Sequence, residues 1–154
     1  MPTEYDTVLE DSIEIAAPPA SVWAMVSDVR RMSEWSPQVQ STRLRDGAQD
    51  VAVGVGFTNL NSNGELKWKT HGTVVRMEVE REIAFRIEEN WTVWTFRLEP
   101  TALGTKLTQR REAPDGYAPE ALQSVENYFG GWVAFTALMR EGMHQTLQAI
   151  KTAV

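Results

Sequence analysis

Polar side chains at inward-facing strand positions are the residues of this sequence best placed to do chemistry. In the predicted strand Thr105–Ala113, Leu107 is expected to face the interior, and strand alternation places Gln109 and Arg111 on the same side. A polar group buried without a partner costs about 1–3 kcal/mol, so an inward polar residue indicates a specific role. An amide and a guanidinium together can polarise a carbonyl or bind a phenol or carboxylate.

Three further polar residues on two neighbouring predicted strands also face inward. Asn59 and Asn61 alternate with Thr58 and Leu60, and Thr70 lies on the inner face of the strand that follows. Together with the amide and the guanidinium above, they are expected to form one polar end of an apolar pocket.

Arg111 has an alternative interpretation. Because arginine is seldom buried without a partner, this interpretation expects its side chain to leave the sheet at the rim. There it would pair with an acid such as Glu112 or Asp115. The sequence leaves both positions open.

His71 is the natural candidate for a general base, but the side of its strand is undecided. It shares parity with Lys67 and Lys69, which favours a solvent-facing position. A bulge before Gly72 would reverse that side. The candidate catalytic residues are therefore Arg111, His71 and Gln109.

Aromatic and methionine side chains supply the candidate apolar walls. Trp68 and Trp94 share the inward parity of apolar neighbours, which is consistent with core filling and with pocket lining. Trp132 lies on the apolar stripe of the predicted C-terminal helix, and methionine adapts to irregular apolar shapes. The full set of candidate ligand-binding residues is Phe57, Asn59, Asn61, Trp68, Thr70, Phe85, Trp94, Phe96, Gln109, Arg111, Phe129, Trp132, Thr136, Met139 and Met143.

Composition argues against several other classes of site. The sequence has no cysteine, and its two histidines are far apart, so we expect neither a metal nor a cofactor. It contains no nucleophile–base pattern and no glycine-rich phosphate loop. The formal charge of −6 argues against nucleic acid and against anionic membrane surfaces. The acidic segment 1–6 lacks a signal-peptide pattern, and no apolar run approaches the ~20 residues of a membrane span, so a cytoplasmic location is expected.

Strands make up most of the elements that must position these residues. Thr7–Ile15 alternates in polarity, and Pro19 then begins a short helix followed by a second short turn, Val29–Trp35. Asn63-Gly64 predicts a type I′ hairpin turn, and Gly72 predicts a bulge or bend. Six strands are expected in the middle of the chain: Val39–Arg45, Val55–Ser62, Glu65–Val79, Ile83–Glu89, Trp91–Glu99 and Thr105–Ala113.

The last third of the chain changes to a helical period. Apolar residues recur every three or four positions from Leu122 to Ile150, which predicts an amphipathic helix that Gly130-Gly131 bends or splits. The element order predicts one α+β domain over residues 1–154. Its seven-stranded, curved antiparallel sheet would hold the long helix in its concave face around an internal cavity.

Short motifs throughout the chain resemble those of one superfamily. They are Ile15-Ala16-Ala17-Pro18-Pro19 before Val22-Trp23, Ser27-Asp28 before Glu34-Trp35-Ser36-Pro37, Phe85-Arg86-Ile87, the run from Trp94 to Pro100, the run from Gly104 to Thr108, and the helix end around Gly142-Met143 and Thr146-Leu147. The chain resembles the START-related (SRPBCC, helix-grip) superfamily, and within it the bacterial polyketide cyclase/dehydrase-like branch. The resemblance implies a helix-grip, START-like ligand-binding domain with a hydrophobic cavity between the sheet and the long helix.

The superfamily includes carriers, enzymes and interaction domains, so three functions are predicted. The first is binding of a small hydrophobic molecule, such as a lipid, polyketide-like or aromatic compound, in the cavity. The alternative is a cyclase or dehydratase acting on a polyketide-like substrate there. The second alternative is a co-chaperone-like interaction module, which would have a filled interior and an exposed apolar patch. The expected partner is a small hydrophobic molecule, and the expected state is a monomer or homodimer.

Overall fold

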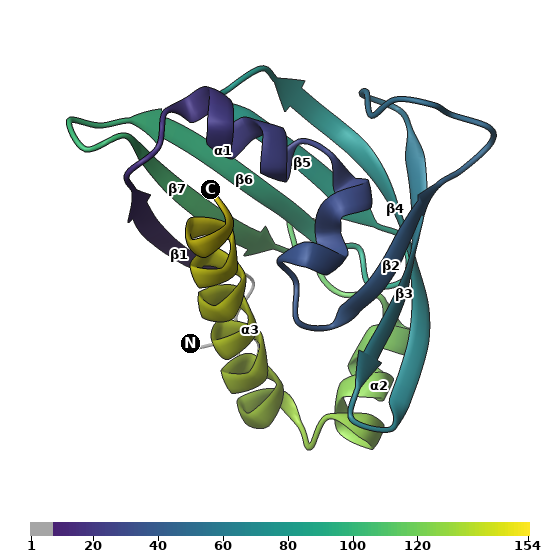
Figure 1. Ribbon diagram of the computed structural model, residues 1–154. Helices are drawn as coiled ribbons and strands as arrows, with labels where there is room; N and C mark the ends of the chain where they lie inside the picture. Colours follow the sequence, from purple (N-terminus) through teal and green to yellow (C-terminus); the bar gives the residue numbers. More distant parts are fainter. Residues whose placement is uncertain (1–7) are drawn as a thin grey trace.

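A seven-stranded antiparallel sheet and a long C-terminal helix dominate the computed structural model, which describes residues 8–154 (Figure 1). The elements follow the predicted order of strand, two short helices, six strands and helix. Thr7 and the acidic segment 1–6 lie outside the described residues. The bounds are β1 Val8–Ile15, α1 Pro19–Val26, η1 Val29–Glu34, β2 Val39–Leu44, β3 Gly56–Asn63, β4 Leu66–Glu78, β5 Glu82–Ile87, β6 Val93–Pro100, β7 Thr105–Glu112, α2 Pro119–Tyr128 and α3 Trp132–Ala153.

The sheet has the strand order β1-β7-β6-β5-β4-β3-β2, and every neighbouring pair is antiparallel. Strands β2 to β7 form a meander, while β1 pairs with β7 in unbroken register from Val8↔Glu112 to Ile15↔Thr105. Because side chains alternate along a strand, every strand presents one face to the helix. The predicted α+β helix-grip fold is confirmed.

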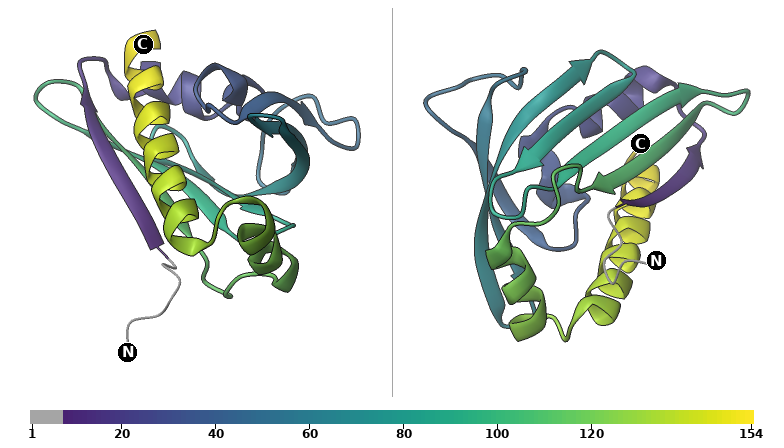
Figure 2. Two further views of the ribbon diagram at one scale, coloured as in Figure 1. Left: turned by 90° about the horizontal axis from the view of Figure 1, so that it is seen from below. Right: turned by 180° about the vertical axis from the view of Figure 1, so that it is seen from behind.

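Helix α3 lies on the concave side of the sheet, beside β1 and β7 (Figure 1 and Figure 2). Its C-terminal half places Leu147 and Ile150 in the main core with Val22 and Val26 of α1. Full burial of such a side chain stabilises the fold by about 1.5–3 kcal/mol, so this half anchors the helix. No helix within residues 8–154 combines the length and the apolar character that a membrane span requires.

The predicted break in the C-terminal helical region is confirmed at the glycine pair. Gly130 and Gly131 have φ values of +75° and +90°, which glycine adopts readily and other residues rarely adopt. Helix α2 ends at Tyr128 and α3 begins at Trp132. Helix α2 therefore diverges from α3 and lies beside the ends of β3 and β4 (Figure 1).

The β3–β4 hairpin turns one residue later than predicted. Asn63 pairs with Leu66, so the central residues are Gly64 and Glu65, and of these only Gly64 has a positive φ, +62°. Glycine at the first central position is typical of a type II′ turn, so the predicted type I′ turn is wrong. A type II′ turn matches the strand twist equally well, and the hairpin keeps its inward face.

Gly72 does not mark the bulge in β4. The register of β4 against β5 shifts between Val74 and Arg76 instead. A Cβ atom at Gly72 would lie 2.3 Å from Cζ of Phe57, its partner across the β3–β4 pair. Phe57 is fully buried and packs edge-on against Phe85, with ring centroids 5.4 Å apart. Glycine is required here by packing on a neighbouring ring.

Gly72→Ala is expected to lower the free energy of unfolding by about 1–3 kcal/mol, because the buried ring must move to admit the methyl group. Chemical denaturation measures this loss. The matched control is Gly142→Ala in α3, where an added Cβ meets nothing within 4 Å. We expect that change to be neutral or to stabilise the helix by up to about 1 kcal/mol. Wild-type stability of Gly72→Ala would contradict the packing argument.

Candidate functional site

A pocket of about 800 Å³ lies between the concave face of the sheet, α2 and the N-terminal half of α3. Exposed residues such as Glu88, Trp91 and Tyr128 belong to its lining, so the pocket opens to solvent beside the β5–β6 loop and α2. The predicted residues that line it are Asn59, Asn61, Trp68, Thr70, Phe85, Trp94, Gln109, Arg111, Phe129, Trp132, Met139 and Met143.

Three of the predicted ligand-binding residues lie outside the pocket lining. Phe57 is packed on Gly72, and Phe96 lies edge-on to Trp35 with ring centroids 5.1 Å apart. Both phenylalanines face inward as predicted, but they belong to the filled part of the core. Thr136 is half-buried on α3 and does not contact the pocket.

Arg111 is the central polar residue of the pocket wall. Only 4% of its surface is exposed, and its guanidinium carbon lies 5.4–5.7 Å from the ring centres of Trp94, Tyr117 and Phe135. These distances fall within the range of cation–π attraction. Its Nη1 donates a hydrogen bond of 2.9 Å to the hydroxyl of Tyr117. Three aromatic rings, one of them the phenol of Tyr117, therefore surround a buried cation.

The predicted alternative, in which Arg111 pairs with an acid at the rim, is wrong. Asp115 accepts from Arg86 at 2.8 Å, and Glu112 lies 3.4 Å from Arg110 on the outer face of β7. Within residues 8–154, no carboxylate forms an ion pair with Arg111. Burial away from water lowers the pKa of the Arg111 guanidinium below its ordinary value, although arginine stays protonated near neutral pH.

Gln109 lies two residues before Arg111 on β7, faces the same side and is buried. No group in the described part of the chain donates a hydrogen bond to its Oε1 atom. The Nε atom of Arg111 is likewise buried without an acceptor from residues 8–154. Because buried polar atoms are nearly always hydrogen-bonded, this wall has donor and acceptor capacity that the protein leaves unused.

All five predicted polar residues line the pocket, but the asparagine group forms its own hydrogen bonds, separately from the residues of β7. Thr42 donates to Asn59 at 2.6 Å, and Asn59 donates to the sulfur of Met32 at 3.4 Å. Asn61 donates to Thr70 at 3.0 Å. Strands β3 and β7 are four positions apart in the sheet, which is about 19 Å along its surface at about 4.8 Å per strand. The two asparagine side chains bond to protein neighbours, whereas Gln109 Oε1 and Arg111 Nε on β7 have no partner among residues 8–154.

Tyr117 is the important pocket residue that sequence reasoning missed. It follows a turn in which the N–H of Gly116 donates to the carbonyl of Ala113, and Gly116 has a φ of +79°. Pro114-Asp115-Gly116 is a recognisable turn sequence, and it folds the chain back over the end of β7. That signal predicts a reversal of the chain, but not that the phenol reaches Arg111.

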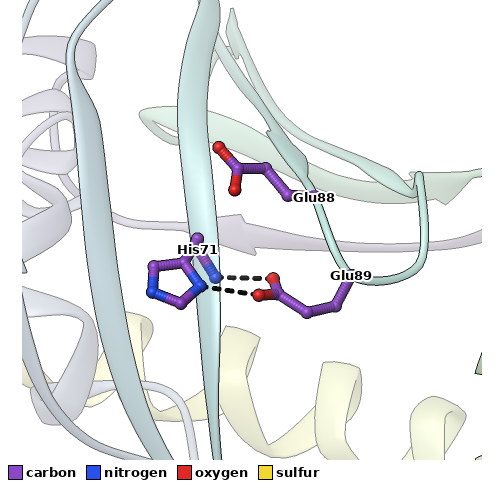
Figure 3. Close-up of side chains that lie close together, drawn as sticks. All are labelled: His71, Glu88 and Glu89. Carbon is purple, nitrogen blue, oxygen red and sulfur yellow. Dashed lines mark hydrogen bonds and ion pairs between the residues drawn. The ribbon is translucent and has the colours of Figure 1, made fainter.

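His71 lies outside the pocket lining and is held by Glu89 (Figure 3). One oxygen of Glu89 accepts the backbone N–H of His71 at 2.7 Å, and the other lies 2.6 Å from its Nδ1. His71, Glu88 and Glu89 bring possible metal-ligand atoms within 4.8 Å of one another, although we expected no metal site from the sequence. Each carboxylate already has a partner, because Glu88 pairs with Arg45 at 3.2 Å.

The curved sheet, the long helix held in its concave face and the pocket between them define a helix-grip protein. The chain belongs to the family described as "Polyketide cyclase / dehydrase and lipid transport", whose model matches residues 6–154. The resemblance inferred from the sequence motifs is therefore confirmed. No curated protein matches the chain.

Solved structures of several differently named proteins share this fold. A Polyketide_cyc-like protein of Corynebacterium glutamicum is 31% identical, with a TM-score of 0.59 over 94% of this chain and 89% of that one. Protein CV1439 of Chromobacterium violaceum is 17% identical, with a TM-score of 0.65 over 97% and 98% of the two chains. The di-domain ARO/CYC StfQ from the steffimycin biosynthetic pathway is 13% identical, with a TM-score of 0.74. This chain is covered over 97% of its length and spans 50% of StfQ.

Arg111→Met is expected to leave the free energy of unfolding unchanged or to raise it, because the variant removes a buried charge that has no carboxylate partner. Tyr117→Phe is expected to lower it by about 1–3 kcal/mol, since the guanidinium then loses its hydrogen-bond acceptor. Chemical denaturation of the two single variants and the double variant measures the coupling. If Tyr117→Phe costs as much in the R111M background, the loss does not come from the Arg111–Tyr117 bond.

Proposed function

We propose that this protein binds a small hydrophobic molecule, such as a lipid, a polyketide-like compound or another aromatic compound, in the pocket under α3. One observation carries the proposal, namely the pocket of about 800 Å³. That volume falls in the range of about 300–1,000 Å³ that is typical of sites for small organic ligands.

The chemistry of the lining supports a hydrophobic ligand. Phe85, Trp94 and Met143 contribute apolar surface from the sheet and α3, and α2 adds Val125 on the opposite side. Apolar burial contributes about 25 cal/mol per Å², so a ring system or acyl chain would be held mainly by this surface. Polar contacts would then fix its orientation.

A cyclase- or dehydratase-type enzyme is the second candidate, and the Arg111–Tyr117 pair favours it. A guanidinium and a phenol in hydrogen-bond contact, within an apolar wall, can stabilise negative charge that develops on a carbonyl oxygen. The interaction-module alternative has less support. It predicts a filled interior, which a pocket of about 800 Å³ does not match.

Filling the pocket is expected to abolish binding of a hydrophobic probe. N-phenyl-1-naphthylamine, which is uncharged and fluoresces in apolar surroundings, should bind the wild type. Ser124→Trp places an indole into the pocket from α2 and should weaken that binding at least about tenfold, which is 1.4 kcal/mol. Fluorescence titration measures the change.

The matched control is Gln123→Trp, one residue earlier on the exposed side of α2. This variant adds the same side chain outside the pocket and should bind the probe like the wild type. If S124W binds the probe as tightly as Q123W and the wild type do, the probe sits outside the pocket. The proposed binding function would then lose its basis.

A further inference from the structure

Arg111 is a buried cation that lacks both a counter-ion and most of its hydrogen-bond acceptors among residues 8–154. A guanidinium has five N–H donors, and the only hydrogen bond that it makes to residues 8–154 is the one from Nη1 to Tyr117. Its Nε atom is buried without an acceptor. The side chain is also buried without a counter-ion among the described residues. A ligand that enters this pocket therefore meets a cation in need of oxygen acceptors.

The surrounding rings meet that requirement only in part. Trp94, Tyr117 and Phe135 lie around the guanidinium carbon at 5.4–5.7 Å and attract the positive charge. Ring faces do not accept the in-plane N–H hydrogen bonds that oxygen atoms accept. The aromatic cage thus stabilises the cation while leaving its directional bonding capacity for a ligand.

A carboxylate matches this site better than a neutral carbonyl or a phosphate. A neutral acceptor would satisfy hydrogen bonds but leave the buried positive charge without neutralisation. A phosphate dianion would bring a second negative charge, and the lysines that line the pocket, Lys67 and Lys69, are exposed on β4, three strands away from β7. One planar monoanion balances one planar cation.

We infer that the ligand is a hydrophobic carboxylic acid, aromatic or aliphatic, whose carboxylate is bound by Arg111 while its apolar body fills the pocket under α3. This inference rests on the proposed binding function. The acidic residues at the pocket entrance do not oppose it strongly. Glu88, Glu89 and Glu120 are exposed and screened by water and salt, whereas Arg111 acts from an apolar wall.

Matched acids and alcohols test the inference directly. Isothermal titration calorimetry at pH 7 compares 2-naphthoate with 2-naphthylmethanol, and decanoate with decanol. In at least one pair the wild type is expected to bind the acid at least about tenfold more tightly than the alcohol, since hydrogen bonds to charged groups are the stronger class. Arg111→Met should reduce that preference to less than about threefold, because the variant lacks the cation that distinguishes the acid from the alcohol.

Arg110→Gln is the control on the same strand. Arg110 faces the opposite side of β7 and lies near Glu10 and Glu112, so the variant should keep the preference for the acid. Arg111→Lys keeps the charge but loses the planar donor array, and should retain only part of the preference.

Two results would overturn the inference while the proposed function survives. In the first, acids and alcohols bind the wild type equally well. In the second, R111M keeps the full preference for the acid. If neither pair binds and the neutral fluorescent probe is also rejected, the proposed function fails together with the inference. The wild-type comparison does not depend on any variant, so a variant that does not fold leaves the test intact.

Discussion

The packing of one face of α3 onto the concave sheet is the constraint on which the rest of the structure depends. A single helix cannot fill the whole hollow of a curved seven-stranded sheet. The C-terminal half of α3 meets α1 and the sheet core through Leu147 and Ile150, and there the interior is closed. The N-terminal half faces the pocket with Trp132 and Met139. One amphipathic stripe therefore stabilises the fold at one end and encloses a ligand-sized space at the other.

The pocket is polar on two walls that differ in kind. On β3 and β4, Asn59 and Asn61 find partners in Thr42 and Thr70, so that wall is complete without a ligand. On β7, Arg111 and Gln109 retain buried atoms without partners in residues 8–154. Such atoms lower stability, and a fold selected for stability alone would replace them by apolar side chains. Their presence on the pocket wall is best explained by a function that needs them.

Strand alternation and helical periodicity predicted the fold and most of the pocket wall, because both patterns report which face of an element is buried. They do not report whether an inward-facing side chain lies in the filled core or at the pocket. Phe57 and Phe96 face inward as expected, yet they lie where the core is filled, and only the position of α1, η1 and α3 decides that. Loops limited the prediction in a second way. Tyr117 reaches Arg111 because a glycine turn folds the chain back, and its partner is set by tertiary contacts that local sequence does not encode.

Binding and catalysis place opposite demands on the same guanidinium. An acid brings a full negative charge in its ground state, so the electrostatic energy of Arg111 is expressed as affinity. A neutral polyketone would meet Arg111 as a weak acceptor, and the same energy would be expressed only when negative charge develops on the oxygen in the transition state. Tight ground-state recognition of an acid uses the stabilisation that a catalyst would keep for its transition state. Whether the natural ligand is an acid or a neutral ketone therefore decides between the carrier and the enzyme, although both would use the same pocket.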